Sequence, residues 1–134
     1  MHTIVTQTVL IAIGGAAGAN ARFWLGSWVA HKVGNESFPW GTLSVNLIGA
    51  FVAGLVSQML ERHNAASAWR YLLIVGFLGG FTTFSAFALE SLGLTFQRHW
   101  GSALGYFLGS PLAGLFAVAA GYGVGRLVGG GFKA

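Results

Sequence analysis

The sequence predicts an all-α integral membrane protein with four transmembrane helices, and three observations support this fold class. Only 7% of the 134 residues are charged, whereas an ordinary soluble domain carries about 25%. Fifty-four per cent of the residues are hydrophobic, which excludes a disordered chain. Four long stretches carry no charge at all, and these are 4–21, 41–60, 71–89 and 100–125.

Each of these stretches is long enough for one span, because a helix of about 20 apolar residues crosses the hydrocarbon core. We expect a single membrane domain over residues 1–134, with spans near 4–28, 41–60, 71–95 and 100–127. Indole rings prefer the headgroup level, so we expect every tryptophan at a span end; these are Trp24, Trp28, Trp40, Trp69 and Trp100. The N-terminus lacks the basic region of a signal peptide, so we expect the first span to be retained.

The composition also excludes several classes of function. The basic residues are scattered singly, so no cluster is available to follow a nucleic-acid backbone. The chain has no cysteine, which excludes disulfides and thiolate metal sites. No nucleophile, base and orienting group converge within the spans. We therefore expect neither nucleic-acid binding nor enzymatic activity.

The positive charges hardly favour one orientation in the membrane. With four spans, both termini and the second loop share one side, which carries Arg62, Arg70, Arg126 and Lys133. The other side carries Lys32, Arg98 and, if it reaches the interface, Arg22. This balance is a weak positive-inside signal. Two alternatives remain open: one weakly favoured orientation, or insertion in both orientations with pairing as an antiparallel dimer.

Small residues four apart recur in every span, a spacing that lets helix backbones approach closely. They are Gly14 and Gly18, Ala50 and Gly54, Gly76 and Gly80, Gly105 and Gly109, and Gly121 and Gly125. Four helices do not easily surround a polar pathway, so these faces favour a tight oligomer. Packing within one subunit is the alternative.

Polar side chains within the spans are candidate functional residues, because they are costly in hydrocarbon. Thr42 and Asn46 lie four residues apart and therefore share a helix face, as do Tyr106 and Ser110. Their amide and hydroxyl groups can donate hydrogen bonds to an anion. They can equally form hydrogen bonds between helices, and the spacing leaves both interpretations open.

The third span holds the densest signal, the segment GGFTTFSAF over residues 79–87. Paired glycines followed by Thr82 and Thr83 form a poor helix, so we expect a break whose carbonyls suit a hard cation such as sodium. A continuous helix with a glycine-rich packing face is the alternative. Phe84 and Phe87 share a face, and their positive ring edges can hold a small anion or simply pack.

Two charged residues lie near span ends. Arg22 could extend to the interface or give an anion vestibule its positive potential. Glu90 could be an interface partner, or a proton carrier in transport. For both residues the sequence leaves the two roles open.

Taken together, these residues resemble the Fluc (CrcB) family of fluoride channels. The matching motifs are GGAAGANAR at 14–22, GTLSVNLIG at 41–49 and GFLGGFTTFSAFALE at 76–90. They follow in order over nearly the whole chain. The resemblance implies a dual-topology homodimer in the cell (inner or plasma) membrane, with two subunits inserted in opposite directions. It implies passive fluoride export through two pores, each lined by both subunits.

The resemblance also implies roles for single residues. Asn46, Phe84 and Phe87 would line the fluoride pathway, and the backbone carbonyls of Gly79 and Thr82 from both subunits would hold a structural sodium ion. The further pathway candidates are Arg22, Thr42, Thr83, Ser85, Tyr106 and Ser110. One departure is Ala86, where the family pattern leads us to expect a threonine, so one hydroxyl contact would be missing.

The main alternative function is a dual-topology, proton-coupled exporter of cationic drugs. Such an exporter needs a membrane-embedded carboxylate that alternates between proton and cation. Glu90 could serve, but it lies at the end of its span and beside phenylalanines. The sequence therefore favours the channel.

Overall fold

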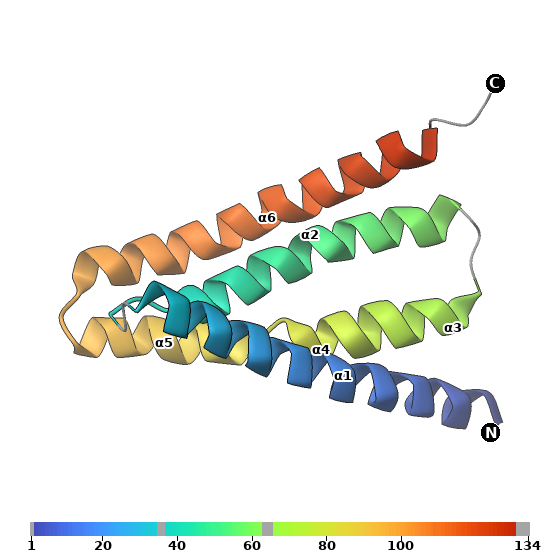
Figure 1. Ribbon diagram of the computed structural model, residues 1–134, viewed down its shortest axis with the longest axis horizontal. Helices are drawn as coiled ribbons and strands as arrows, with labels where there is room; N and C mark the ends of the chain where they lie inside the picture. The colour runs from blue at the N-terminus through green and yellow to red at the C-terminus, as the bar shows by residue number, and fades with distance from the viewer. Residues whose placement is uncertain (1, 35–36, 63–65, 131–134) are drawn as a thin grey trace.

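The computed structural model describes residues 2–34, 37–62 and 66–130, and every regular element among them is helical. The elements are α1 (His2–Val33), α2 (Trp40–Arg62), α3 (Ser67–Trp69), η1 (Arg70–Leu78), α4 (Gly79–Phe81), α5 (Phe84–Phe96) and α6 (Trp100–Gly130). Elements α3, η1, α4 and α5 follow one another as parts of one bent third helix (Figure 1).

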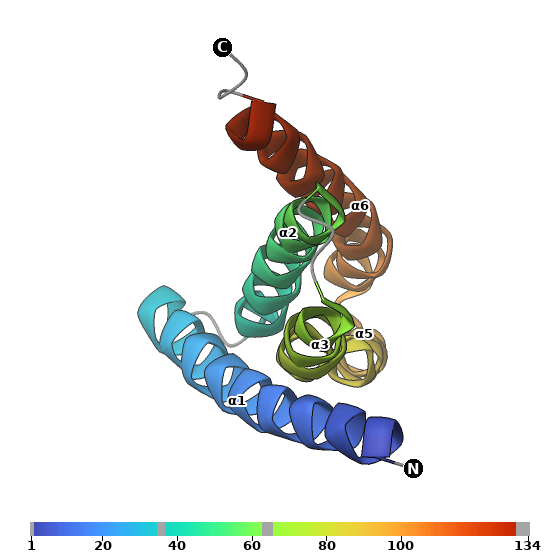
Figure 2. The same cartoon turned by 90° about the vertical axis from the view of Figure 1, so that its right-hand side faces the viewer.

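Four stretches of the described residues are long and apolar enough to cross a membrane, which confirms the predicted fold class. They are Thr3–Val33, Trp40–Arg62, Ser67–Phe96 and Trp100–Val128. The first turn of α1 and the last turn of α6 lie at the same end of the bundle (Figure 1). Seen along the bundle, α1 lies on one side and α6 on the other, with α2 and the third helix between them (Figure 2).

Glycines bring the helices of one subunit into close contact. A Cβ atom at Gly121 would overlap the carbonyl oxygen of Phe51 on α2, and one at Gly18 would overlap the carbonyl of Phe77 on η1. Backbone atoms of a neighbouring helix also crowd Gly14, Gly54, Gly76 and Gly80. Several of the predicted small faces therefore pack inside the subunit. By contrast, no described residue outside α6 comes within 4 Å of a Cβ placed at Gly105 or Gly109.

The third helix breaks between Phe81 and Phe84, as predicted. Thr82 (φ −81°, ψ 157°) and Thr83 (φ −147°, ψ 117°) are both extended. The N–H and the hydroxyl of Thr82 both donate to the carbonyl of Leu78, each at 2.9 Å. The hydroxyl oxygen of Thr83 accepts from the N–H of Ala86 at 3.2 Å and so caps α5. One threonine ends the first half of the helix, and the next begins the second.

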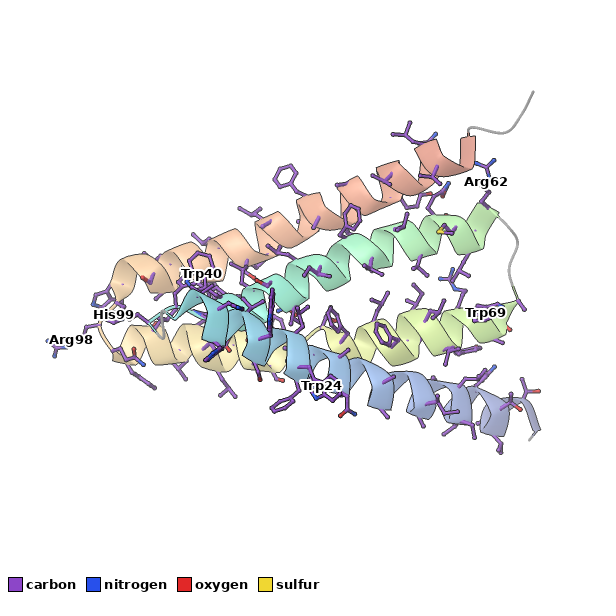
Figure 3. All side chains as sticks on the ribbon, in the orientation of Figure 1. Trp24, Trp40, Arg62, Trp69, Arg98 and His99 are labelled. Atoms are coloured by element: carbon purple, nitrogen blue, oxygen red, sulfur yellow. The ribbon has the colours of Figure 1, made fainter. Side chains whose placement is uncertain are left out.

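The two ends of the bundle carry most of the aromatic and charged residues that we expect at the membrane surface. Arg62 and Trp69 lie at one end, and Arg98 and His99 lie at the other (Figure 3). Trp24 differs from the expectation, because it lies well before the end of α1 at Val33. The helix continues beyond the predicted span. Lys133, which contributes to the charge balance, lies outside the described residues.

We predict that Gly121→Ala destabilises the protein while Gly101→Ala does not. The new methyl group at position 121 would push α6 away from the backbone of α2, whereas no described residue outside α6 comes within 4 Å of a Cβ at Gly101. We expect the free energy of unfolding in detergent to fall by about 2 kcal/mol for Gly121→Ala. Equal stability of the two variants would show that α2 and α6 do not pack in this way.

Candidate functional site

A cavity of about 500 Å³ lies at the helix break, between α2, η1, α4, α5 and α6. It brings together seven of the eleven residues predicted for the site, which are Asn46, Gly79, Thr82, Thr83, Phe84, Phe87 and Ser110. These residues come from three of the four spans, so the bundle assembles them from motifs that are far apart in the sequence.

Asn46 binds the backbone of the break with both ends of its amide. Its Nδ2 donates to the carbonyl of Thr83 at 3.0 Å, and its Oδ1 accepts from the N–H of Thr83 at 2.8 Å. Both distances are those of good hydrogen bonds. The amide thus meets the polar groups of Thr83 much as a neighbouring strand would.

These bonds divert two donors from their usual helical acceptors. In an unbroken helix the N–H of Thr83 would donate to the carbonyl of Gly79, and the N–H of Ala86 would donate to that of Thr82. Here they donate to Asn46 and to the side chain of Thr83. The carbonyls of Gly79 and Thr82 are thereby released from helical pairing, and the Thr82 carbonyl accepts a long bond of 3.4 Å from Nη1 of Arg22.

The two phenylalanines after the break differ sharply in exposure. Their ring centroids lie 5.7 Å apart with planes inclined at 45°. Phe87 is only 5% exposed and packs against Tyr106 and Phe107, whereas Phe84 is 79% exposed. Phe84 therefore projects out of the subunit at the site of the break.

A second polar cluster joins three spans around Glu90. The hydroxyl of Thr42 donates to Oε1 of Glu90 at 2.6 Å, and the hydroxyl of Tyr106 donates to Oε2 at 2.8 Å. Tyr106 is 1% exposed. Glu90 and Thr42 also line a cavity of about 460 Å³ that reaches Gln97 near the end of the bundle.

Glu90 is absent from the predicted pathway residues, although it binds two of them. The signal that could have identified it is the position of a carboxylate inside an apolar span, since such residues usually have polar partners and a function. Its partners lie on two other helices, so the order of the sequence does not reveal them.

A third cavity, of about 490 Å³, is lined by three of the four remaining predicted residues, Arg22, Thr42 and Ser85, whereas Tyr106 lies buried beside Glu90. The wall of this cavity also includes Ser27, Thr83 and Ala86, among others. Thr42 is shared with the cavity at Glu90, and Thr83 is shared with the cavity at the break. The hydroxyls of Thr83 and Ser85 lie 3.3 Å apart. Ala86 therefore leaves this cavity without the hydroxyl group that a threonine would add to its wall. The cavity still offers a small anion the hydroxyls of its serines and threonines and the half-buried guanidinium of Arg22.

Comparison with known proteins gives a consistent result. The family profile described as "CrcB-like protein, Camphor Resistance (CrcB)" matches residues 9–122. The fluoride-specific ion channel FluC of Rhizobium leguminosarum bv. trifolii is 46% identical over 122 residues, which cover 90% of this chain and 96% of the relative. That of Chloroflexus aurantiacus is 43% identical over 127 residues, which cover 94% and 100%. That of Hahella chejuensis is 42% identical over 125 residues, which cover 92% and 98%.

We predict that Tyr106→Phe destabilises the protein much more than Tyr122→Phe. Both hydroxyls donate to a glutamate, but Tyr106 is buried and binds Glu90, whereas Tyr122 is exposed and binds Glu61 at 3.1 Å. Loss of a buried bond to a carboxylate costs about 1.5–3 kcal/mol, whereas water screens an exposed pair and can replace the bond that is lost. Equal losses in thermal or chemical unfolding would contradict the buried cluster.

Proposed function

The chain belongs to the CrcB family of fluoride-specific ion channels, and we propose that it lets fluoride leave the cell passively, down its electrochemical gradient. It is a multi-pass membrane protein and not an enzyme, and we place it in the cell (inner or plasma) membrane as a single domain over residues 1–134. The drug-exporter alternative is not supported, because the two hydroxyl bonds to Glu90 leave its carboxylate engaged rather than open to a cation.

The observation that carries this proposal is the set of groups around the cavity at the break. Fluoride is small and strongly hydrated, so a pore must replace its water with donors that bind moderately and release it again. Asn46 has a second N–H beyond the one given to Thr83. Ser110 adds a hydroxyl to the same cavity, and Phe84 and Phe87 add ring edges of positive potential. None of these groups carries a full positive charge, so they can bind an anion without trapping it.

Arg22 and Ser85 line the third cavity, which we call the vestibule. We propose that the guanidinium attracts fluoride to this vestibule and that the hydroxyls of Ser85 and Thr83 then replace water around the ion. Ala86 makes this wall less polar than a threonine would. The shared residue Thr83 connects the vestibule with the phenylalanines.

Thr42 and Tyr106 can serve fluoride only in alternation with Glu90. Each hydroxyl has one proton, and in this structure both protons are donated to the carboxylate. The ion must therefore take a hydroxyl from Glu90, so that the hydroxyl proton points to fluoride instead of to the carboxylate. We propose that Glu90 holds the two hydroxyls in place between passages of the ion.

The exposure of the break supports a dimer. A backbone carbonyl without a donor is tolerated at membrane depth only where protein or a water-filled cavity covers it. Gly79, whose carbonyl has lost its helical donor, and Phe84, the first residue after the break, are both exposed on the single subunit. We propose that a second copy covers this surface. The near balance of positive charge favours insertion in both orientations, so that the pair is antiparallel and forms two fluoride pores.

The released carbonyls of Gly79 and Thr82 suit a sodium ion in the dimer. Carbonyl oxygens of unwound helices are favoured ligands of sodium in membrane proteins, and both carbonyls are free of their helical donors. Two subunits related by a twofold axis supply four such oxygens. When bound, the ion contributes a positive charge that links the subunits. We propose that it is structural and does not travel with fluoride.

We predict that liposomes loaded with fluoride and containing the purified protein release fluoride rapidly while retaining chloride. Phe84→Ile should lower the rate of release by at least about tenfold, because it removes one of the ring edges. Phe96→Ile is the matched control, since Phe96 is similarly exposed on the same helix and lies apart from the cavity at the break. The liposomes contain potassium fluoride, and valinomycin carries potassium out so that no opposing voltage builds up. A fluoride electrode follows the release. Release no faster than from protein-free liposomes would overturn the proposed channel.

We also predict that His99→Cys is half accessible to a membrane-impermeant maleimide in intact cells. The chain has no cysteine, and His99 lies exposed at one end of the bundle (Figure 3). Dual topology places this residue outside in one half of the molecules and inside in the other. Full labelling is expected once detergent opens the membrane. Labelling of all or of none of the molecules in intact cells would contradict antiparallel insertion.

A further inference from the structure

We propose that Asn46 is a positioning residue that keeps the third helix broken and thereby creates the cation site, in addition to lining the fluoride pathway. The inference rests on the proposed function, because it assigns a second task to a residue of the same site. It couples two features that the pathway alone does not connect, the pore wall on α2 and the carbonyls on the third helix.

The geometry of the amide carries the first step. A carboxamide holds one acceptor and one donor side by side in a plane, and Asn46 sets these against the N–H and the C=O of one residue, Thr83, at 2.8 and 3.0 Å. No hydroxyl side chain offers a donor and an acceptor so far apart. Thr83 is 9% exposed, so water is a poor substitute for either bond.

The cost of losing these bonds carries the second step. Without Asn46, the N–H and C=O of Thr83 would be left unpaired in apolar surroundings, which is strongly unfavourable. The nearest remedy is the ordinary helical one, in which the N–H of Thr83 donates to the carbonyl of Gly79. The break would then close from its N-terminal side, and Gly79 would lose its free carbonyl. Asn46 therefore determines whether the carbonyl of Gly79 accepts a helical hydrogen bond or is free to bind a cation.

Ser110 provides the contrast within the same cavity. It lies on α6, is 8% exposed, and lines the cavity with Asn46. The backbone bonds that divert the donors of the break are made by Asn46 and Thr83. A residue that only lines the pathway should affect fluoride flux and leave the cation site unchanged, whereas a residue that holds the break should weaken cation binding.

The test is the sodium dependence of thermal unfolding of the purified full-length protein, with N-methyl-D-glucamine replacing sodium at constant ionic strength. A ligand that binds only the folded state raises stability with its concentration, so the titration yields a midpoint. We expect Asn46→Leu, which has a similar volume and forms no hydrogen bond, to raise the sodium midpoint by at least about tenfold. Ser110→Ala should stay within about twofold of the unmodified protein.

Rescue by a conservative variant separates positioning from general stability. A protonated aspartic acid at position 46 again offers one donor and one acceptor. At a pH low enough to protonate it, Asn46→Asp should recover a midpoint close to that of the unmodified protein at the same pH, while Asn46→Leu should not. If Asn46→Leu does not fold, Asn46→Ser replaces it, because its shorter side chain satisfies at most one group of Thr83; we then expect a rise of at least about threefold.

Three results would overturn the inference. The first is equal sodium midpoints for Asn46→Leu and Ser110→Ala, and the second is no recovery of the midpoint by protonated Asn46→Asp. The third is thermal unfolding of the unmodified protein that does not depend on sodium. Fluoride release from liposomes is measured on the same preparations. If the unmodified protein releases fluoride but its unfolding does not depend on sodium, the positioning role of Asn46 and the cation site are both refuted, while the proposed channel stands. If it responds to sodium and releases no fluoride, the channel fails.

Discussion

The structure depends on one constraint of the bilayer, that every backbone N–H and C=O must be paired where no water can reach it. Three of the spans satisfy this rule by remaining helical. The third stops being helical at Thr82 and Thr83, so its backbone groups there need other partners. Hydrogen bonds hold the break on each side. The N–H and hydroxyl of Thr82 donate to the carbonyl of Leu78, and the hydroxyl oxygen of Thr83 caps α5. The amide of Asn46 on α2 binds the N–H and the C=O of Thr83. The carbonyl of Gly79 has lost its helical donor and that of Thr82 accepts the long bond from Arg22; these are the two oxygens that we propose as ligands of a sodium ion.

In the proposed function, the same break relates ion binding to assembly. Phe84 and Gly79, which a single subunit leaves exposed, line the same cavity as the amide of Asn46 and the ring of Phe87. A second copy placed over the break would shield the backbone, complete the cavity and double the number of free carbonyls. The fluoride pathway, the sodium site and the dimer would then be three consequences of one interrupted helix.

Much of the fold could be predicted from the sequence, because hydrophobic length and the absence of charge determine the spans directly. The break was also predictable, since Gly79, Gly80 and two threonines are poor helix formers in succession. The bonds from Thr42 and Tyr106 to Glu90 were not, because the three residues come from three helices. Nor does spacing reveal that Gly121 packs within the subunit while Gly105 does not, since identical four-residue intervals serve either purpose. Trp24 was misplaced because α1 continues to Val33.

The most direct test of the central claim is the environment of residue 84 in a lipid bilayer. A spin label on a single cysteine at this position, in a chain that otherwise has none, reports collisions with oxygen dissolved in the lipid. If a second copy covers the break, the label should be shielded from oxygen although Phe84 is 79% exposed on the isolated subunit. A collision rate as high as that of a label facing lipid would contradict the account, because no second copy would then cover the surface beside the break.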